Sequence, residues 1–424
     1  MGMIQISPFP LPPLIEAPVS KSHLQRELIL SLLSDQPSRL KGNFKLLPDD
    51  GLYAIKTLVT LGAKVQVSPT EITVIPPALG SLREEVYFSV GESGFLLRTM
   101  LCVGFLFARR LRIDAAGTLL SRDLRATFDS LRQLGIAQRN TKGTWPIVLE
   151  RIEPWPHELR WDASETSQVV TGLLFTMARG SGPKELTLIN PVSLPYITLS
   201  LQGIANRGVS FVQTQNTFSV GTSNPIQGKP VQVQGDWSGA SNLLCMAAIR
   251  GQIRLAGLPL GSNQADEKIL TILKDFGAEV ETSTDTVWVK SKAQCPIAVD
   301  VTHCPDLFPA VSVLASCANG ISAISGTHRL YNKESNRLEA TCMMLAQLGV
   351  RYEIQSDTLF VHGGFHYRNG MVISHHDHRI VLAAIVAAYA LETEVAVDEM
   401  ESIKKSFPEM KQFLSLKGIQ PKII

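Results

Sequence analysis

The stretch LVTLGAKV, residues 58–65, joins an apolar helix to a strand through Gly62. An apolar turn followed by Gly and then Ala, Val or Ile is typical of a helix with a glycine C-cap that leads into a strand. The pattern recurs at intervals of about 70 residues along the whole chain. The recurrences are LRQLGI at Gly135, IANRGV at Gly208, LKDFGAEV at Gly277, LAQLGV at Gly349 and FLSLKGI at Gly418. Such a period predicts six copies of one α/β unit.

A second, more apolar helix is predicted ahead of each of these segments at a matching offset. Because these helices have little polar surface, we expect them to be the buried, inner helices. Short β-branched runs between the helices, such as EITVIP (71–76) and DTVWVK (285–290), indicate strands. The six inner helices are expected to begin near Ser22, Gly94, Ser167, Ala240, Leu307 and His378.

Six repeats suggest two halves of three. A polar stretch that contains Gly and Pro, SNPIQGKPVQVQGD (223–236), separates the third repeat from the fourth and predicts a hinge. The segment MIQIS (3–7) has strand character, and the pattern leaves open which half it pairs with.

Composition excludes several classes of protein. Of the 424 residues, 45% are hydrophobic and 18% are charged, which is typical of a globular chain with more than one core. A formal charge of +2 gives no reason to expect nucleic acid or an acidic membrane as a partner. The six cysteines are scattered without a C-x-x-C pair, so we expect free thiols in a reducing compartment. We therefore expect a cytoplasmic protein with neither a signal peptide nor a membrane span.

Small and hydroxyl-bearing residues gather in the turns that enter the inner helices. Such residues are ordinary N-caps, but basic side chains accompany them here, and the start of a helix binds anions through its amides and its dipole. Convergence of these turns, which the repeat implies, would give a site for a ligand with a phosphate and a carboxylate. The basic residues are Lys21, Arg26, Arg98, Arg122, Lys333, Arg337, Arg379 and Lys405.

A cluster of histidines before the last inner helix invites comparison with a metal site. His375, His376 and His378 surround Asp377, but their spacing lacks the i, i+4 geometry of a helical zinc site. We therefore predict no metal.

Ten motifs occur in the order and spacing of the 3-phosphoshikimate 1-carboxyvinyltransferase (EPSP synthase) family, which the chain resembles over nearly its whole length. They are PVSKSHLQREL, GESGFLLR, TSQ, SLPY, GDWSGAS, NQADEKI, CPDLFP, LYNKESNRL, DHR and KKSFPEM. The resemblance implies an α/β, two-domain enolpyruvyl transferase fold, an inside-out α/β barrel in which each domain holds three βαβαββ units. It implies one domain of residues 18–234 and another of residues 1–17 and 235–424. It also implies a monomer without metal or organic cofactor.

The resemblance further implies the substrates, phosphoenolpyruvate and shikimate 3-phosphate, and the residues that bind them. The positions that match the shikimate 3-phosphate ligands are Lys21, Ser22, Arg26, Thr166, Ser167, Gln168, Ser193, Tyr196, Asp306 and Lys333. Those that match the phosphoenolpyruvate ligands are Lys21, Gly94, Arg122, Gln168, Arg337, Arg379 and Lys405.

The expected chemistry needs one group that takes a proton and another that delivers one. Protonation of C3 makes C2 of phosphoenolpyruvate electrophilic, the 5-hydroxyl of shikimate 3-phosphate attacks C2, and phosphate is then eliminated. This reaction belongs to the shikimate pathway. The carboxylates at family positions suited to these proton transfers are Asp306 and Glu334, and Lys21 is a third candidate. We expect Asp306 and Lys21 near the attacking hydroxyl, and Glu334 near C3.

One turn departs from the family pattern. Glu92, Ser93, Gly94 and Phe95 stand where Asn or Asp, Ala or Ser, Gly and Thr are usual. A carboxylate beside an anionic substrate is repulsive unless it points away or pairs, and Arg98 is the candidate partner.

Two other functions compete with this interpretation. A UDP-N-acetylglucosamine enolpyruvyl transferase shares the repeat but usually carries a reactive Cys on a mobile loop, whereas Cys102, the only Cys before residue 245, lies in an apolar helix. A non-catalytic anion-binding relative would be expected to have lost catalytic groups, but Lys21, Asp306 and Glu334 are all present.

Overall fold

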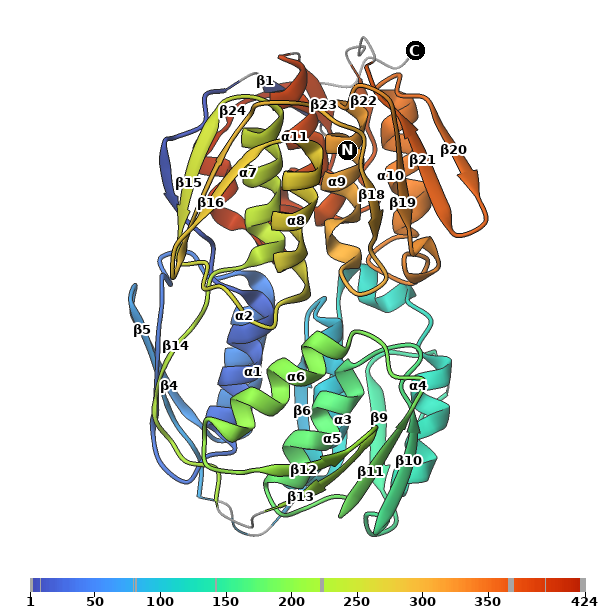
Figure 1. Cartoon of the computed structure of the whole chain (residues 1–424). Coiled ribbons are helices and arrows are strands. Elements are labelled where there is room, and N and C mark those ends of the chain that lie inside the picture. The colour runs from blue at the N-terminus through green and yellow to red at the C-terminus, as the bar shows by residue number, and fades with distance from the viewer. Residues whose placement is uncertain are drawn as a thin grey trace. The chain divides into compact units, whose positions relative to one another are not determined.

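The structure, a computed structural model, describes residues 3–7, 9–78, 80, 82–141, 143–221, 225–364, 370–392 and 394–419. The chain forms two compact units, one of Met1–Ser20 with Gln234–Ile424 and one of Lys21–Val233. Within the described residues the strands form six four-stranded sheets, three in each unit (Figure 1).

The middle repeat of the unit Lys21–Val233 shows the pattern that the others follow. Its elements are β6 (Arg83–Ser89), α3 (Gly94–Val103), η1 (Gly104–Leu106), β7 (Ala108–Asp114), η2 (Gly117–Ser121), α4 (Arg125–Ser130), η3 (Leu131–Leu134), β8 (Ile136–Gln138) and β9 (Ile147–Arg151). β6 pairs parallel with β7, and β9 pairs antiparallel with both β7 and β8. This arrangement is the βαβαββ unit that the family resemblance implies.

The other repeats of this unit differ in where their first strand comes from. One consists of β10 (Glu158–Asp162), α5 (Gln168–Ala178), β11 (Glu185–Ile189), α6 (Leu194–Ala205), β12 (Phe211–Thr214) and β13 (Thr217–Val220). The other consists of α1 (Lys21–Leu32), β3 (Ser38–Lys41), α2 (Asp49–Thr60), β4 (Lys64–Val67) and β5 (Glu71–Ile75). Its first strand is β14 (Pro230–Gln232), from the far end of the unit, which pairs parallel with β3.

The second unit, Met1–Ser20 with Gln234–Ile424, includes two strands from residues 3–16. One repeat is continuous: β18 (Ala298–Asp300), η5 (Pro305–Leu307), α9 (Phe308–Ser316), β19 (Ile321–Ser325), η6 (Thr327–Arg329), α10 (Arg337–Gln347), β20 (Tyr352–Gln355) and β21 (Thr358–His362). A second takes β2 (Leu14–Glu16), then α7 (Trp237–Ile249), β15 (Gln252–Ala256), η4 (Ala265–Lys268), α8 (Ile269–Phe276), β16 (Glu279–Thr282) and β17 (Thr286–Lys290). The third runs through β22 (Met371–Val372), α11 (His378–Leu391), β23 (Val395–Val397), η7 (Met400–Lys405), η8 (Pro408–Phe413) and β24 (Ser415–Ile419), and β1 (Met3–Ser7) supplies its last strand. The strand near MIQIS therefore belongs to this unit, a point that the sequence left open.

The six inner helices begin where the sequence predicts, within three residues. In the unit that contains residues 234–424, α7, α9 and α11 contact one another in pairs, and every residue of α7 is buried (Figure 1). In the other unit α3 packs against α5, and all ten residues of α3 are buried. In the unit that contains residues 234–424, α7, α9 and α11 each also pack against strands of a sheet. No described helix is both long and apolar enough to cross a membrane.

The glycine pattern holds five times and fails once. Gly62 and Gly277 follow α2 and α8 with φ of +105° and +96°, and Gly135, Gly208 and Gly349 take the same left-handed conformation. The expectation of a sixth helix ending at Gly418 is wrong, because Gly418 lies in β24 and pairs with Ile4. The preceding helix is a short 3₁₀ turn that ends at Phe413, so pairing with β1 overrides the local pattern.

Candidate active site

The residues expected in the site divide between the two units. The unit Lys21–Val233 holds Lys21, Ser22, Arg26, Gly94, Arg122, Thr166, Ser167, Gln168, Ser193 and Tyr196. The other unit holds Asp306, Lys333, Glu334, Arg337, Arg379 and Lys405.

Two guanidinium groups meet at the first residue of α3. A Cβ atom on Gly94 would lie 2.9 Å from Nη1 of Arg98 and 2.9 Å from Nη1 of Arg122. Nη1 of Arg98 donates a hydrogen bond of 3.0 Å to Oε1 of Gln168, the first residue of α5. The structure thus brings Gly94, Arg122 and Gln168 together. Two guanidinium groups at the start of a helix favour an anion.

Ser93 fixes the start of α3. Its Oγ accepts a hydrogen bond of 3.2 Å from the backbone N of Leu96 and donates one of 2.8 Å to Oε1 of Gln25 on α1. The cap therefore determines where α3 begins and also ties it to α1.

Arg26 is almost fully buried on α1 and is held by several elements. Its Nε donates to Oγ of Ser200 at 2.9 Å, and its other nitrogens donate to the carbonyl oxygens of Ser22 at 2.8 Å and Tyr196 at 3.3 Å. Cζ of Arg26 lies 4.5 Å from the ring centroid of Phe95, a cation–π contact. Burial lowers the pKa of Arg26 to about 10. The unusual Phe95 therefore packs on one of the residues expected to bind shikimate 3-phosphate.

Lys21 is the first residue of α1. Its Nζ lies 3.2 Å from Oδ2 of Asp50, a buried carboxylate on α2. An ammonium group at the first residue of a helix is suited to an anionic ligand. Asp50 was not singled out from the sequence, since acidic residues in the first turn of a helix are common there.

Hydroxyl groups occupy the starts of α5 and α6. Oγ1 of Thr166 accepts a hydrogen bond of 3.2 Å from the backbone N of Gln168, and Ser167 is 5% exposed. Ser193 precedes α6 with φ of +54°, and Tyr196 lies in its first turn. These residues place hydroxyl groups at the starts of two helices, where an anion is stabilised by the helix dipole.

In the other unit, Arg337 is the hub of an ionic cluster. Its Nη1 donates to Oδ1 of Asp306 at 2.6 Å, and its Nη2 donates to Oε2 of Glu334 at 2.6 Å. Nε and Nη2 donate to the two carboxylate oxygens of Asp377 at 3.0 and 3.3 Å. The Arg337 side chain is fully buried, and the carboxylates raise its pKa although burial opposes this. One guanidinium therefore orients both candidate catalytic carboxylates.

Asp306 is shared between two arginines. Its Oδ1 accepts from Arg337, and its Oδ2 accepts from Nη2 of Arg379 at 3.1 Å. Burial alone would raise the pKa of Asp306, but Arg379 and then Arg337 lower it far below its usual range. Nε and Nη1 of Arg379 are buried and have no hydrogen-bond acceptor among the described residues. Those two donors are suited to a ligand anion.

Glu334 and Lys405 lie on the other side of this hub. Nζ of Lys405, a buried residue of η7, lies 3.6 Å from Oε1 of Glu334. Burial lowers the pKa of the neighbouring Lys333 to about 8, against a partly compensating effect of Asp306. Asp306, Glu334, Arg337, Arg379 and Lys405 thus form one cluster.

Two further carboxylates border the cluster. Asp236 caps α7, since its Oδ2 accepts a hydrogen bond of 2.9 Å from the backbone N of Gly239. Asp266 is fully buried and accepts a hydrogen bond from Oγ of Ser238. Burial, and then the charge of Asp306, raise the pKa of Asp266 to about 7. Asp266 carries no local sequence signal beyond its place in NQADEKI.

Asp377 was not expected among the site residues. It caps α11 by accepting a hydrogen bond of 2.9 Å from the backbone N of Arg379, and it also binds Arg337. The DHR motif drew attention to His378 and Arg379, but a pairing between residues 40 positions apart has no local signal. No three His, Cys, Asp or Glu side chains of the described chain lie close enough to hold a metal ion together.

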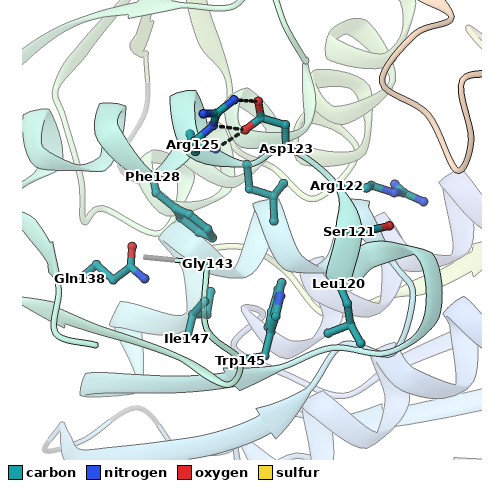
Figure 2. A pocket seen from close by; sticks show the side chains of 11 residues that line it. Leu120, Ser121, Arg122, Asp123, Arg125, Phe128, Gln138, Gly143, Trp145 and Ile147 are labelled. Atoms are coloured by element: carbon teal, nitrogen blue, oxygen red, sulfur yellow. Dashed lines mark hydrogen bonds and ion pairs between the residues drawn. The ribbon is translucent and has the colours of Figure 1, made fainter. Parts of the chain in front are cut away.

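A cavity of about 320 Å³ borders the segment that carries Arg122. Its walls are largely apolar, with Leu124, Phe128, Trp145 and Ile147 among them, and the Asp123–Arg125 ion pair lies at its edge. Figure 2 shows the Arg122 side chain pointing away from Phe128 and Trp145. The guanidinium is therefore directed out of the apolar cavity.

Comparison with protein families and curated sequences gives one consistent result. The family model for EPSP synthase (3-phosphoshikimate 1-carboxyvinyltransferase) matches residues 9–414. A 3-phosphoshikimate 1-carboxyvinyltransferase from Pyrococcus abyssi is 32% identical over 409 residues, which are 96% of this chain and 94% of that protein. The one from Pyrococcus furiosus is 33% identical over 395 residues, which are 92% of this chain and 94% of that protein.

Solved structures share the fold at lower identity. An EPSP synthase from Acinetobacter baumannii matches with a TM-score of 0.80 and 20% identity, over 99% of this chain and 100% of that one. The enolpyruvyl transferase NikO from Streptomyces tendae matches with a TM-score of 0.70 and 15% identity, over 99% of each chain. The expected enolpyruvyl transferase fold is confirmed.

Proposed function

Because the chain belongs to the EPSP synthase (3-phosphoshikimate 1-carboxyvinyltransferase) family, we propose that it transfers the enolpyruvyl group of phosphoenolpyruvate to the 5-hydroxyl of shikimate 3-phosphate. The observation that carries this proposal at the level of residues is the cluster in which Arg337 joins Asp306 to Glu334 and Arg379 keeps two buried donors for an anion. We further propose that the protein acts as a monomer in the cytoplasm, without a cofactor.

In the proposed reaction, a proton is added to C3 of phosphoenolpyruvate while the substrate hydroxyl forms a bond to C2. The hydroxyl proton passes to Asp306 or Lys21, and Glu334 delivers the proton to C3. In the second half-reaction C3 loses a proton and the bond from C2 to the phosphate oxygen breaks, which releases phosphate and regenerates the double bond. Arg122, Arg337, Arg379 and Lys405 balance the charges of carboxylate and phosphate.

Asp306 and Glu334 suit separate roles because they accept hydrogen bonds from different nitrogens of the Arg337 guanidinium, Nη1 and Nη2. With a strongly lowered pKa, Asp306 is ionised and is a weak base while two arginines hold it. An incoming anion that draws those arginines away would raise its basicity. Binding of phosphoenolpyruvate would therefore activate Asp306.

Phosphate release by the purified protein tests the function. We expect phosphate release when phosphoenolpyruvate and shikimate 3-phosphate are both present. We expect none when UDP-N-acetylglucosamine replaces shikimate 3-phosphate. Phosphate release with UDP-N-acetylglucosamine would instead identify the chain as a UDP-N-acetylglucosamine enolpyruvyl transferase. If folded protein released no phosphate with either acceptor, the chain would be an anion-binding protein without turnover.

Gly94→Ala should weaken phosphoenolpyruvate binding specifically. The new methyl group would lie 2.9 Å from the Nη1 atoms of Arg98 and Arg122, so both guanidinium groups must move. We expect KM for phosphoenolpyruvate to rise about 10-fold, the equivalent of about 1.4 kcal/mol, with KM for shikimate 3-phosphate unchanged. Gly80→Ala is the matched control, because a Cβ there has no atom within 4 Å. Equal KM values for Gly94→Ala and wild type would contradict the assignment.

Binding of shikimate 3-phosphate should weaken as Lys333 loses its charge. Because its pKa is lowered to about 8, we expect KM for shikimate 3-phosphate to rise roughly 10-fold per pH unit above that value. Lys333→Arg stays charged and should give a flat profile.

The same shift affects stability in the opposite sense. Between about pH 8 and the ordinary lysine value of 10.5, the unfolded chain binds more protons at Lys333 than the folded one, so this group makes stability rise with pH. Unfolding midpoints measured at each pH would show whether a rise in KM comes from denaturation. A KM profile shared by wild type and Lys333→Arg would exclude Lys333 as the titrating ligand.

A further inference from the structure

Glu92, the carboxylate that departs from the family pattern, is engaged by the segment that leads to Arg122. It lies half-buried in the turn between β6 and α3, two residues before Gly94. Its Oε2 accepts hydrogen bonds from the backbone N of Thr118 at 3.3 Å and from Oγ1 of Thr118 at 3.0 Å. The expectation that Glu92 must point away or pair is thus met by Thr118, in η2.

Thr118 links this carboxylate to Arg122. While its hydroxyl donates to Glu92, its Oγ1 accepts a hydrogen bond of 3.4 Å from Nη2 of Arg122. A carboxylate only accepts and a guanidinium only donates, so the direction of both bonds is fixed. The chain of contacts runs from Glu92 through Thr118 to the guanidinium that lies against Gly94.

The backbone is shaped to admit the Glu92 side chain. Gly117 has φ of +51°, and a Cβ atom there would lie 1.9 Å from Oε1 of Glu92 and 2.3 Å from its Cδ. Nearby backbone bonds, from Val90 N to Asp114 O and from Ala116 N to Gly91 O, both 2.9 Å, hold the two segments together. In this position the Glu92 side chain therefore requires glycine at 117.

Packing beyond Thr118 is uneven, although Leu119 and Leu124 are buried. Residues 120–125 border the cavity of about 320 Å³, where there is space in place of packed atoms. Leu120 is 47% exposed. Figure 2 shows Arg122 directed away from the apolar walls of this cavity. The hydrogen bonds to Glu92 are thus polar contacts that help to hold the segment.

We propose that Glu92 is a positioning residue, which acts through Thr118 to hold the Arg122 guanidinium at Gly94 in the orientation that binds phosphoenolpyruvate. The inference rests on the proposed function, which assigns Arg122 to that substrate. Because Thr118 donates hydrogen bonds to the Glu92 carboxylate, that carboxylate is occupied. The substrate anion would therefore bind the Arg122 guanidinium that Glu92 orients.

Two pairs of variants test the proposal. Glu92→Ala and Thr118→Val break the chain of hydrogen bonds, whereas Glu92→Gln and Thr118→Ser retain an acceptor and a hydroxyl at the same places. We expect the first pair to raise KM for phosphoenolpyruvate about 10-fold, the loss of one hydrogen bond to a charged group, and to leave KM for shikimate 3-phosphate unchanged. The second pair should stay within about 2-fold of wild type by the same reasoning. The double variant Glu92→Ala/Thr118→Val should lose no more than either single variant.

Glu85→Ala is the matched control. Glu85 is an exposed glutamate on β6 that pairs with Arg110 and does not contact the Arg122 segment in any described bond. A KM in Glu92→Gln as high as in Glu92→Ala would overturn the proposal, because the hydrogen bonds would then be irrelevant. An equal rise in KM for both substrates would do the same, since it would indicate a general structural role.

Hydrogen exchange without substrate separates this inference from the proposed function. We expect amides of residues 117–122 to exchange faster in Glu92→Ala than in wild type or Glu92→Gln, with the rest of the unit unchanged. If wild type released no phosphate, the proposed function would fail, and exchange alone would decide the inference. Unchanged exchange in Glu92→Ala would reject it.

Discussion

Arg337→Ala is expected to lower turnover sharply and to destabilise the unit that contains it. The change removes the guanidinium that binds Asp306, Glu334 and Asp377, two of them largely buried. Removing one partner of a buried ion pair costs about 3–5 kcal/mol, because charges are left uncompensated. Loss of a group that stabilises the developing charge lowers kcat by about 10³-fold. Phosphate release and denaturant unfolding measure the two effects.

Arg337→Lys separates catalysis from folding. Lysine restores one positive charge but lacks the planar fork that holds three carboxylates, so we expect stability to recover in part while kcat/KM stays at least about 100-fold down. Arg351→Ala is the control, since Arg351 is an exposed arginine of the same unit that pairs with Glu353. Full activity in Arg337→Lys would show that charge alone, without bidentate geometry, is sufficient.

Asp306→Asn is expected to lower kcat by about 10³-fold while phosphoenolpyruvate binds as tightly as in wild type or more tightly. Asparagine cannot take a proton from the substrate hydroxyl, so turnover is lost. In wild type the Asp306 carboxylate occupies Arg337 and Arg379, and a substrate anion must displace it. A neutral amide competes less, which leaves both arginines to the ligand. Steady-state kcat and equilibrium binding of phosphoenolpyruvate measure the two effects separately.

The opposed directions make this prediction specific. A purely structural role for Asp306 would weaken both binding and turnover. Asp285→Asn, in the exposed turn between β16 and β17, is the control for removing a negative charge from this unit. If Asp306→Asn kept a wild-type kcat, Asp306 would not be a catalytic residue, and Glu334 and Lys21 would remain.

The sequence predicts the elements that depend on local pattern, and it misses pairings between distant residues. The starts of all six inner helices follow from apolar periodicity and small capping residues, as at Ser93 and Asp236. The prediction of a helix ending at Gly418 was wrong because β24 pairs with β1 from the opposite end of the chain, and this pairing overrides the local helix signal.

The site shows the same division. Arg337 and Arg379 were expected from their motifs, and Asp377 was not, because its contact with Arg337 spans 40 positions. Glu92 could be recognised as unusual, but its partner Thr118 and the space provided by Gly117 depend on how two turns meet in three dimensions. Local spacing cannot encode those distances.

The strands that residues 3–16 lend to the second unit impose an order of events during synthesis. The strands of the unit Lys21–Val233 all lie between Ser38 and Gln232, whereas β1 must wait for β23 and β24, which begin about 400 residues after it. At about 5–20 residues per second, that delay is roughly 20–80 s. Until then a nascent chain carries an unpaired strand whose partner does not yet exist, and an unpaired edge invites pairing with other chains. The protein's need for protection by chaperones should therefore be concentrated at its first sixteen residues.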